Sequence, residues 1–149
     1  MNHIALIERE GNPQFDIVID GRQLQEHFVG RHGAHPSQVF AIGWKGAQID
    51  TQRGDFDRFM LRRDSTLVSG RVPVLVCEEC GDIGCGAIAV RIERIGSIVK
   101  WSDWAFENGY EPARALDWSS YPESLQFDWI EYEGALASVL PGERAHAGQ

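Results

Sequence analysis

The sequence predicts an α+β domain built on a mainly antiparallel sheet with two or three short helices. The strongest observation is a series of three extended apolar segments, residues 72–77, 87–94 and 97–104, which are separated only by short turns. Parallel strands need crossovers of a dozen or more residues, so these segments are expected to form an antiparallel meander. A length of 149 residues, with 43% hydrophobic and 24% charged side chains, is typical of one soluble domain, here 1–149.

The start of the chain predicts a strand pair. Residues 4–8 form the first strand, and the alternation of apolar and polar side chains over 15–20 predicts a second strand antiparallel to it. A short helix over 22–29 and a strand over 39–44 are expected next.

One amphipathic helix is expected before the meander. Phe56, Phe59 and Met60 have helical spacing, which predicts a short helix over 56–63 with a basic end at Arg63. The preceding tripeptide at 53–55, Arg-Gly-Asp, predicts a turn.

Three elements are expected after the meander. Residues 112–118 predict a short helix, residues 125–132 a last strand, and residues 135–140 a closing helical turn.

The formal net charge of −8 lies wholly in the second half of the chain. Residues 1–75 hold nine acids and nine bases, whereas residues 76–149 hold 13 acids and five bases. Such an acidic half repels nucleic acid and anionic lipid, so neither a nucleic acid nor a membrane is expected as a partner. A basic protein is the partner that the charge favours.

The sequence favours the cytoplasm as the compartment. No apolar run is long enough for a signal-peptide core or a membrane span. An odd number of cysteines, all between residues 77 and 85, does not suit the disulfide framework of a secreted protein.

The cysteine turn, residues 77–86, allows three interpretations. Cys77, Cys80 and Cys85 have the spacing of a zinc knuckle, whose fourth ligand would be His32, His35 or Asp82. A C-x2-C pair is also found in thiol redox proteins, but the glycines here break the helix that lowers a thiol pKa. Thirdly, the cysteines can be small packing residues, which predicts three reduced thiols and no metal.

The segment 101–132 combines aromatic and acidic side chains. It holds nine aromatic residues and one base, Arg114. Aromatic anchors inside an acidic rim are typical of a surface that binds a cationic protein. The partner-binding residues predicted on this basis are Asp103, Trp104, Glu107, Asp128, Glu131 and Glu133.

The sequence around the cysteine turn resembles a small bacterial family of uncharacterised function. The resemblance rests on the strand 72–76, the CGxxGC turn at 80–85, the strand 87–93 and the V-x-W-x-D strand at 99–103. Size, acidity and layout are, more loosely, similar to immunity proteins of bacterial toxin systems such as contact-dependent inhibition. This similarity implies a cytoplasmic protein that binds and neutralises a basic toxin domain. The alternative is a zinc-binding protein or metal-dependent enzyme centred on the cysteine turn, and no catalytic residue is identified.

Overall fold

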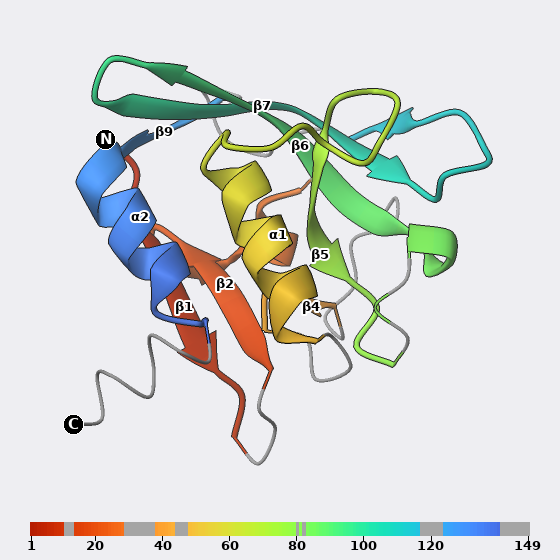
Figure 1. Cartoon of the computed structure of the whole chain (residues 1–149), viewed down its shortest axis with the longest axis horizontal. Coiled ribbons are helices and arrows are strands. Elements are labelled where there is room, and N and C mark those ends of the chain that lie inside the picture. Colours follow the sequence, from red (N-terminus) through yellow and green to blue (C-terminus); the bar gives the residue numbers. More distant parts are fainter. Residues whose placement is uncertain are drawn as a thin grey trace.

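The computed structural model describes residues 1–10, 14–28, 38–43, 48–79, 81, 83–116 and 124–140, and it has the expected α+β class. In these residues a six-stranded sheet, a three-stranded sheet and two α-helices surround the main core (Figure 1), and Val39, Val76 and Ala87 form a second, smaller apolar cluster. The mainly antiparallel character predicted from the sequence is confirmed.

The three-stranded sheet begins with the predicted strand pair. β1 (Ile4–Glu8) and β2 (Phe15–Ile19) are antiparallel, with Ile4 opposite Ile19. Every second side chain of β2 is buried, as the period of a strand requires. The short β3 (Arg22–Gln23) and a single 3-10 turn, η1 (Leu24–His27), stand where a longer helix was expected.

The meander forms the centre of the six-stranded sheet. β5 (Val72–Val76), β6 (Ala87–Ile95) and β7 (Ile98–Glu107) are antiparallel neighbours, as predicted. β4 (Val39–Phe40) pairs with β5, and it ends earlier than expected; Trp44 lies outside the described residues.

Two further strands pair with β7. β8 (Arg114–Ala115) stands where a helix over 112–118 was predicted, so that prediction is wrong for the described residues. β9 (Leu125–Asp128) pairs with the first part of β7, and Val99 lies opposite Phe127.

The helix α1 (Ile49–Phe59) starts seven residues before the expected helix over 56–63, and it also ends earlier, at Phe59. The tripeptide at 53–55 therefore lies inside a helix, and the turn predicted there is wrong. The backbone leaves the helix at Leu61, whose φ of 61° is left-handed. Arg62 and Arg63 follow the last turn, where positive charge is favourable beside the helix dipole.

The helix α2 (Trp129–Ala137) occupies part of the last predicted strand. The strand ends at Asp128 because its carboxylate accepts the backbone N–H of Glu131 and caps the helix. The backbone N–H of Trp129 donates to the carbonyl of Ser97 at 2.8 Å, which fixes the start of α2 beside the β6–β7 turn.

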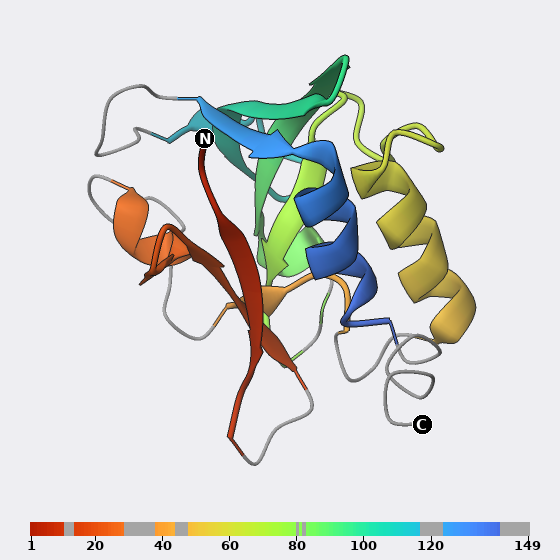
Figure 2. The same cartoon turned by 90° about the vertical axis from the view of Figure 1, so that its left-hand side faces the viewer.

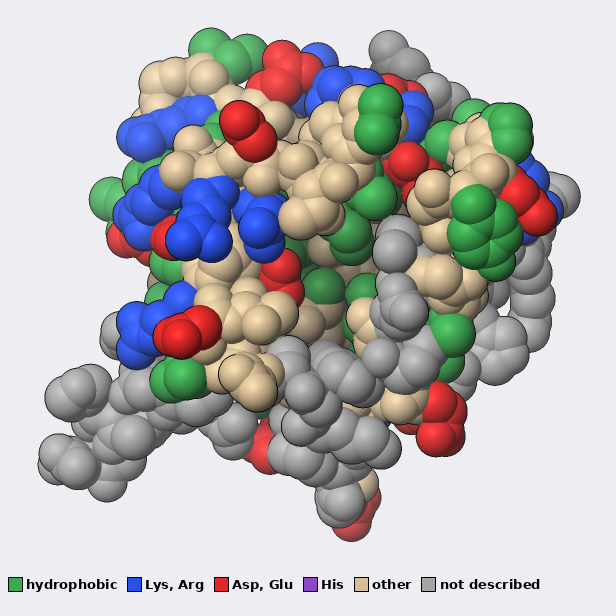
Figure 3. Space-filling view, turned by 45° about the vertical axis from the view of Figure 1, so that its right-hand side comes forward, with side chains coloured by type: hydrophobic (Ala, Val, Ile, Leu, Met, Phe, Trp, Pro, Cys, Tyr) green, Lys and Arg blue, Asp and Glu red, His purple; other side chains and the backbone are tan. Residues whose placement is uncertain are grey.

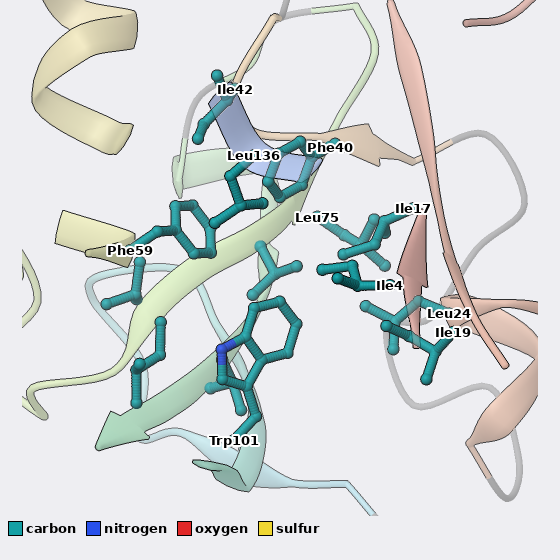
Figure 4. Close-up of a cluster of buried hydrophobic side chains, with 14 of the residues drawn as sticks. Ile4, Ile17, Ile19, Leu24, Phe40, Ile42, Phe59, Leu75, Trp101 and Leu136 are labelled. Carbon is teal, nitrogen blue, oxygen red and sulfur yellow. The ribbon is translucent and has the colours of Figure 1, made fainter. Parts of the chain in front are cut away.

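The two helices lie side by side and cover one side of the core (Figure 2). Beneath them, aromatic rings from both helices, β7 and β9 pack around the fully buried Trp101, which is part of the apolar cluster in Figure 4. In the described part of the chain, no helix has the length and apolar character needed to cross a membrane.

The N-terminal segment joins the two sheets. The backbone N–H of Asn2 donates to the carbonyl of Gln126 at 2.8 Å, and the Asn2 side-chain oxygen accepts from the Gln126 N–H at 2.9 Å. The Asn2 side chain also donates to Asp20 at 2.7 Å. Asn2, which precedes β1, therefore bonds both Asp20, directly after β2, and Gln126 in β9.

We expect Gly86→Ala to destabilise the fold strongly. Gly86 has a φ of 93°, and a Cβ there would overlap the ring of Phe106. A left-handed backbone costs an L-residue roughly 1–2 kcal/mol, and overpacking adds about 1–3 kcal/mol. Gly96→Ala is the matched control, because Gly96 has a φ of 61° with no atom within 4 Å. Chemical denaturation should show the larger loss for Gly86→Ala; equal losses would mean that the ring moves aside at no cost.

Candidate functional site

Trp104, one of the predicted partner-binding residues, lies in the core. Its side chain is 3% exposed and makes edge contacts with Phe28 and Trp101, at centroid distances of 5.2 and 5.7 Å. In a regular strand Trp101 and Trp104 would point to opposite faces. A bulge between β6 and β7 adds one residue, Asp103, and returns Trp104 to the inner face.

Asp103 is held by two arginines. Its carboxylate pairs with Arg71 at 3.0 Å and with Arg91 at 3.3 Å, and its carbonyl accepts from Arg71 Nε at 2.8 Å. The hydrogen bond from Arg71 is the main reason that the pKa of Asp103 lies below its ordinary value, with Arg91 acting in the same direction. The left-handed φ of 58° at Asp103 is one that Asp tolerates better than most residues.

Glu107 belongs to the same group of side chains. It is 9% exposed, accepts from the hydroxyl of Ser69 at 2.8 Å, and pairs with Arg71 at 3.4 Å. We name Ser69, Arg71, Arg91, Asp103 and Glu107 the Arg71 cluster. The contacts of Ser69 and Arg71 join the segment before β5 to β7. Because two arginines balance two carboxylates, the cluster does not form an acidic patch.

The three predicted residues of α2 remain at the surface. Glu131 is 44% exposed and contacts His3 Nδ1 at 3.1 Å, while Glu133 is 43% exposed and pairs with Arg62 at 3.1 Å. Asp128 caps the helix. The structure thus places the six predicted residues at three sites: the core, the Arg71 cluster and the start of α2.

The start of α2 lies beside the end of the β6–β7 hairpin and carries exposed apolar side chains. Ile95 is 64% and Ile130 79% exposed, and the guanidinium of Arg94 stacks on the half-buried Trp129 ring at 3.7 Å. We name this surface the hairpin–helix corner. Its residues are Arg94, Ile95, Asp128, Trp129, Ile130, Glu131 and Glu133.

A groove between α1 and α2 was not predicted from the sequence. It has a volume of about 480 Å³, an apolar floor that includes Phe56 and Leu140, and a rim with Arg53, Arg62 and Glu133. No sequence signal marks it, because its residues come from two helices far apart in the chain.

The cysteine turn is described only in part. Cys77, at the end of β5, is a free thiol, whereas Cys85, in the 3-10 turn η2 (Ile83–Cys85), is disulfide-bonded. The expectation of three reduced thiols is therefore wrong for this structure. Cys80, Asp82, His32 and His35 lie outside the described residues.

A zinc ion at this turn needs thiolate ligands. In its disulfide form Cys85 cannot supply one, so zinc would bind only after reduction. The part of the chain that the structure describes holds no group of three His, Cys, Asp or Glu side chains that could ligate a metal. A zinc site on Cys77, Cys80 and Cys85 thus stays a proposal for the reduced protein.

Thiol counting separates the two states of the turn. A chain with three cysteines and one internal disulfide should show one thiol, Cys77, before reduction and three afterwards. Maleimide labelling with peptide mapping by mass spectrometry measures this. If zinc holds the thiolates instead, labelling should rise on addition of a chelator without any reductant.

We expect Asp103→Asn to lower stability in a pH-dependent way. Because the folded-state pKa lies below the ordinary value of 3.8, the carboxylate stabilises the fold above that value and loses the effect as the pH falls through the folded-state pKa. Asp103 is partly exposed, so the loss at pH 7 should be about 0.2–1 kcal/mol. Urea unfolding at neutral and acid pH tests this; a difference that persists unchanged in acid would exclude the charge as its cause.

Comparisons with family models, with curated proteins and with solved structures find no match to this chain, so the resemblance drawn from its sequence stays a prediction.

Proposed function

We propose that the protein is a cytoplasmic immunity-type protein that binds and neutralises a basic bacterial toxin domain through the hairpin–helix corner. The observation that carries the proposal is the exposure of two isoleucines, Ile95 at the end of β6 and Ile130 in α2, where Ile130 is followed by Glu131. Large apolar side chains are costly to leave in water, and an acidic rim around them favours a cationic partner.

The corner is a narrower surface than the one predicted from sequence. Asp103 and Glu107 are neutralised within the Arg71 cluster, and Trp104 is buried. Trp129 takes the place of Trp104 as the aromatic anchor, since its ring is half-buried and lies at the surface beside Arg94. Central apolar contacts would supply most of the affinity and the surrounding carboxylates most of the association rate.

The carboxylates of the corner are not equally free to meet a partner. The Asp128 carboxylate already accepts the hydrogen bond that caps α2. Glu133 would have to break its ion pair with Arg62 before it could pair with a basic residue of the partner. Within the described residues, the Glu131 carboxylate forms an ion pair with the exposed side chain of His3 alone, and that pair carries charge only when the histidine is protonated. Glu131 is therefore the residue whose charge should matter most to association.

The proposal expects a gene for a basic toxin domain next to the gene of this protein. The test is co-expression of that toxin domain with this protein, read out as bacterial growth, together with association kinetics of the purified pair. Glu131→Lys should slow association by roughly threefold to tenfold at low salt, and the difference should shrink as salt is added. Ile130→Ala should speed dissociation by about tenfold, in line with a central apolar contact.

Glu111→Lys is the matched control. It makes the same change in net charge at an exposed residue of the acidic half that does not belong to the corner. Thermal unfolding of each variant separates lost binding from lost folding. The proposal fails if the toxin domain kills cells that contain the wild-type protein, or if Glu131→Lys and Glu111→Lys slow association equally.

A further inference from the structure

The helix α1 contains a glycine that its backbone does not require. Gly54 lies near the middle of the helix, and its backbone does not have the positive φ that would call for a glycine. Glycine in a helix interior costs about 1 kcal/mol relative to alanine. The apolar side of α1 is formed by Phe56 and Phe59, and Gly54 lies on a different side, yet it is buried.

Two arginines cover this glycine. A Cβ built on Gly54 would lie 3.0 Å from Nη1 of Arg63 and 3.5 Å from Nη1 of Arg58. Both guanidinium groups thus approach the helix where a side chain would otherwise stand. The missing side chain is what lets both groups come this close to the helix backbone.

The positive charge at this point is only partly balanced. Arg58 donates to the carboxylate of Asp55 at 3.1 Å and to the backbone carbonyl of Asp64 at 3.1 Å. Arg63 makes no ion pair within the described residues. Asp55 is therefore the one carboxylate in the described residues that pairs with either of these two arginines. Figure 3 shows a face of the molecule on which Lys and Arg side chains gather toward the left-hand side.

We propose that Gly54, Arg58 and Arg63 form a cradle for a phosphate-class oxyanion. A guanidinium group presents paired N–H donors that match two oxygens of a phosphate, and phosphate has enough oxygens to accept from two such groups at once. A monocarboxylate has only two oxygens, which two guanidinium groups would have to share, as Arg71 and Arg91 share the carboxylate of Asp103. The cradle shares no residue with the hairpin–helix corner and is independent of the proposed toxin binding.

The test is titration of the whole protein with inorganic phosphate and with pyrophosphate, at constant ionic strength and with acetate as the reference anion. Both phosphates should raise the melting temperature of the wild-type protein above its value in acetate, because a ligand that binds only the folded state stabilises it. Arg63→Gln should weaken the apparent phosphate affinity at least about tenfold, the cost of losing one charge-assisted pair.

Gly54→Ala gives the sharper result. It should raise the melting temperature in acetate, because alanine favours the helix, and it should also abolish the response to phosphate, because the new methyl group displaces Arg63. A purely structural glycine would show the first effect without the second. Arg53→Ala, in the same helix and with the same loss of charge, should keep the phosphate response.

Two outcomes overturn the proposal. One is a wild-type response to phosphate no larger than that to acetate. The other is an equal loss of affinity in Arg53→Ala and Arg63→Gln, which would mean diffuse charge attraction rather than a cradle. Glu131→Lys should leave the phosphate response unchanged, so failure of the toxin proposal does not affect this test.

Discussion

The fold depends on how the indole of Trp101 is accommodated at the centre of the core. Its ring is fully buried and packs against Phe59, Phe127 and Tyr132, with centroid distances of 5.2 to 6.1 Å. Its N–H donates to the Tyr132 hydroxyl at 3.3 Å, which in turn donates to the carbonyl of Phe59 at 2.8 Å. An unsatisfied buried donor costs about 1–3 kcal/mol, so this series of bonds makes β7, α2 and the end of α1 mutually dependent. The same burial raises the pKa of Tyr132 and keeps its hydroxyl protonated as a donor.

Local patterns in the sequence predicted the strands better than the elements that deviate from regular periodicity. The pair at 4–8 and 15–20 and the meander were predicted because alternation and short turns are properties of neighbouring residues. The bulge at Asp103 was missed, although the buried Trp101 and Trp104, three residues apart, satisfy the alternation only if one residue is added between them. The start of α2 was missed because 125–132 has the composition of a strand; Asp128 followed by Glu131 is the capping signal that marks the helix.

Ion pairs between the two halves of the chain neutralise part of the acidic excess in the second half. Arg9, Arg62 and Arg71 of the first half pair with Glu78, Glu133, Asp103 and Glu107 of the second. A count along the chain could not show this, because the pairs join residues 32 to 71 positions apart. The partner surface predicted from the sequence therefore stays a proposal, and it is now limited to the acidic residues at the start of α2 and their neighbours. The groove and the arginine cradle depend on tertiary contacts, which cannot be predicted from the amino-acid composition.

The bonds of Asn2 have a consequence for the order of events during synthesis. Asn2 is synthesised 124 residues before its partner Gln126. The β1–β2 hairpin can pair early, since its strands are close in sequence, whereas its attachment to β9 and α2 must wait. Until then the apolar face of β2 has no cover from the C-terminal elements, which is the state in which chains aggregate. A nascent chain stalled before β9 would thus be a natural substrate for chaperones.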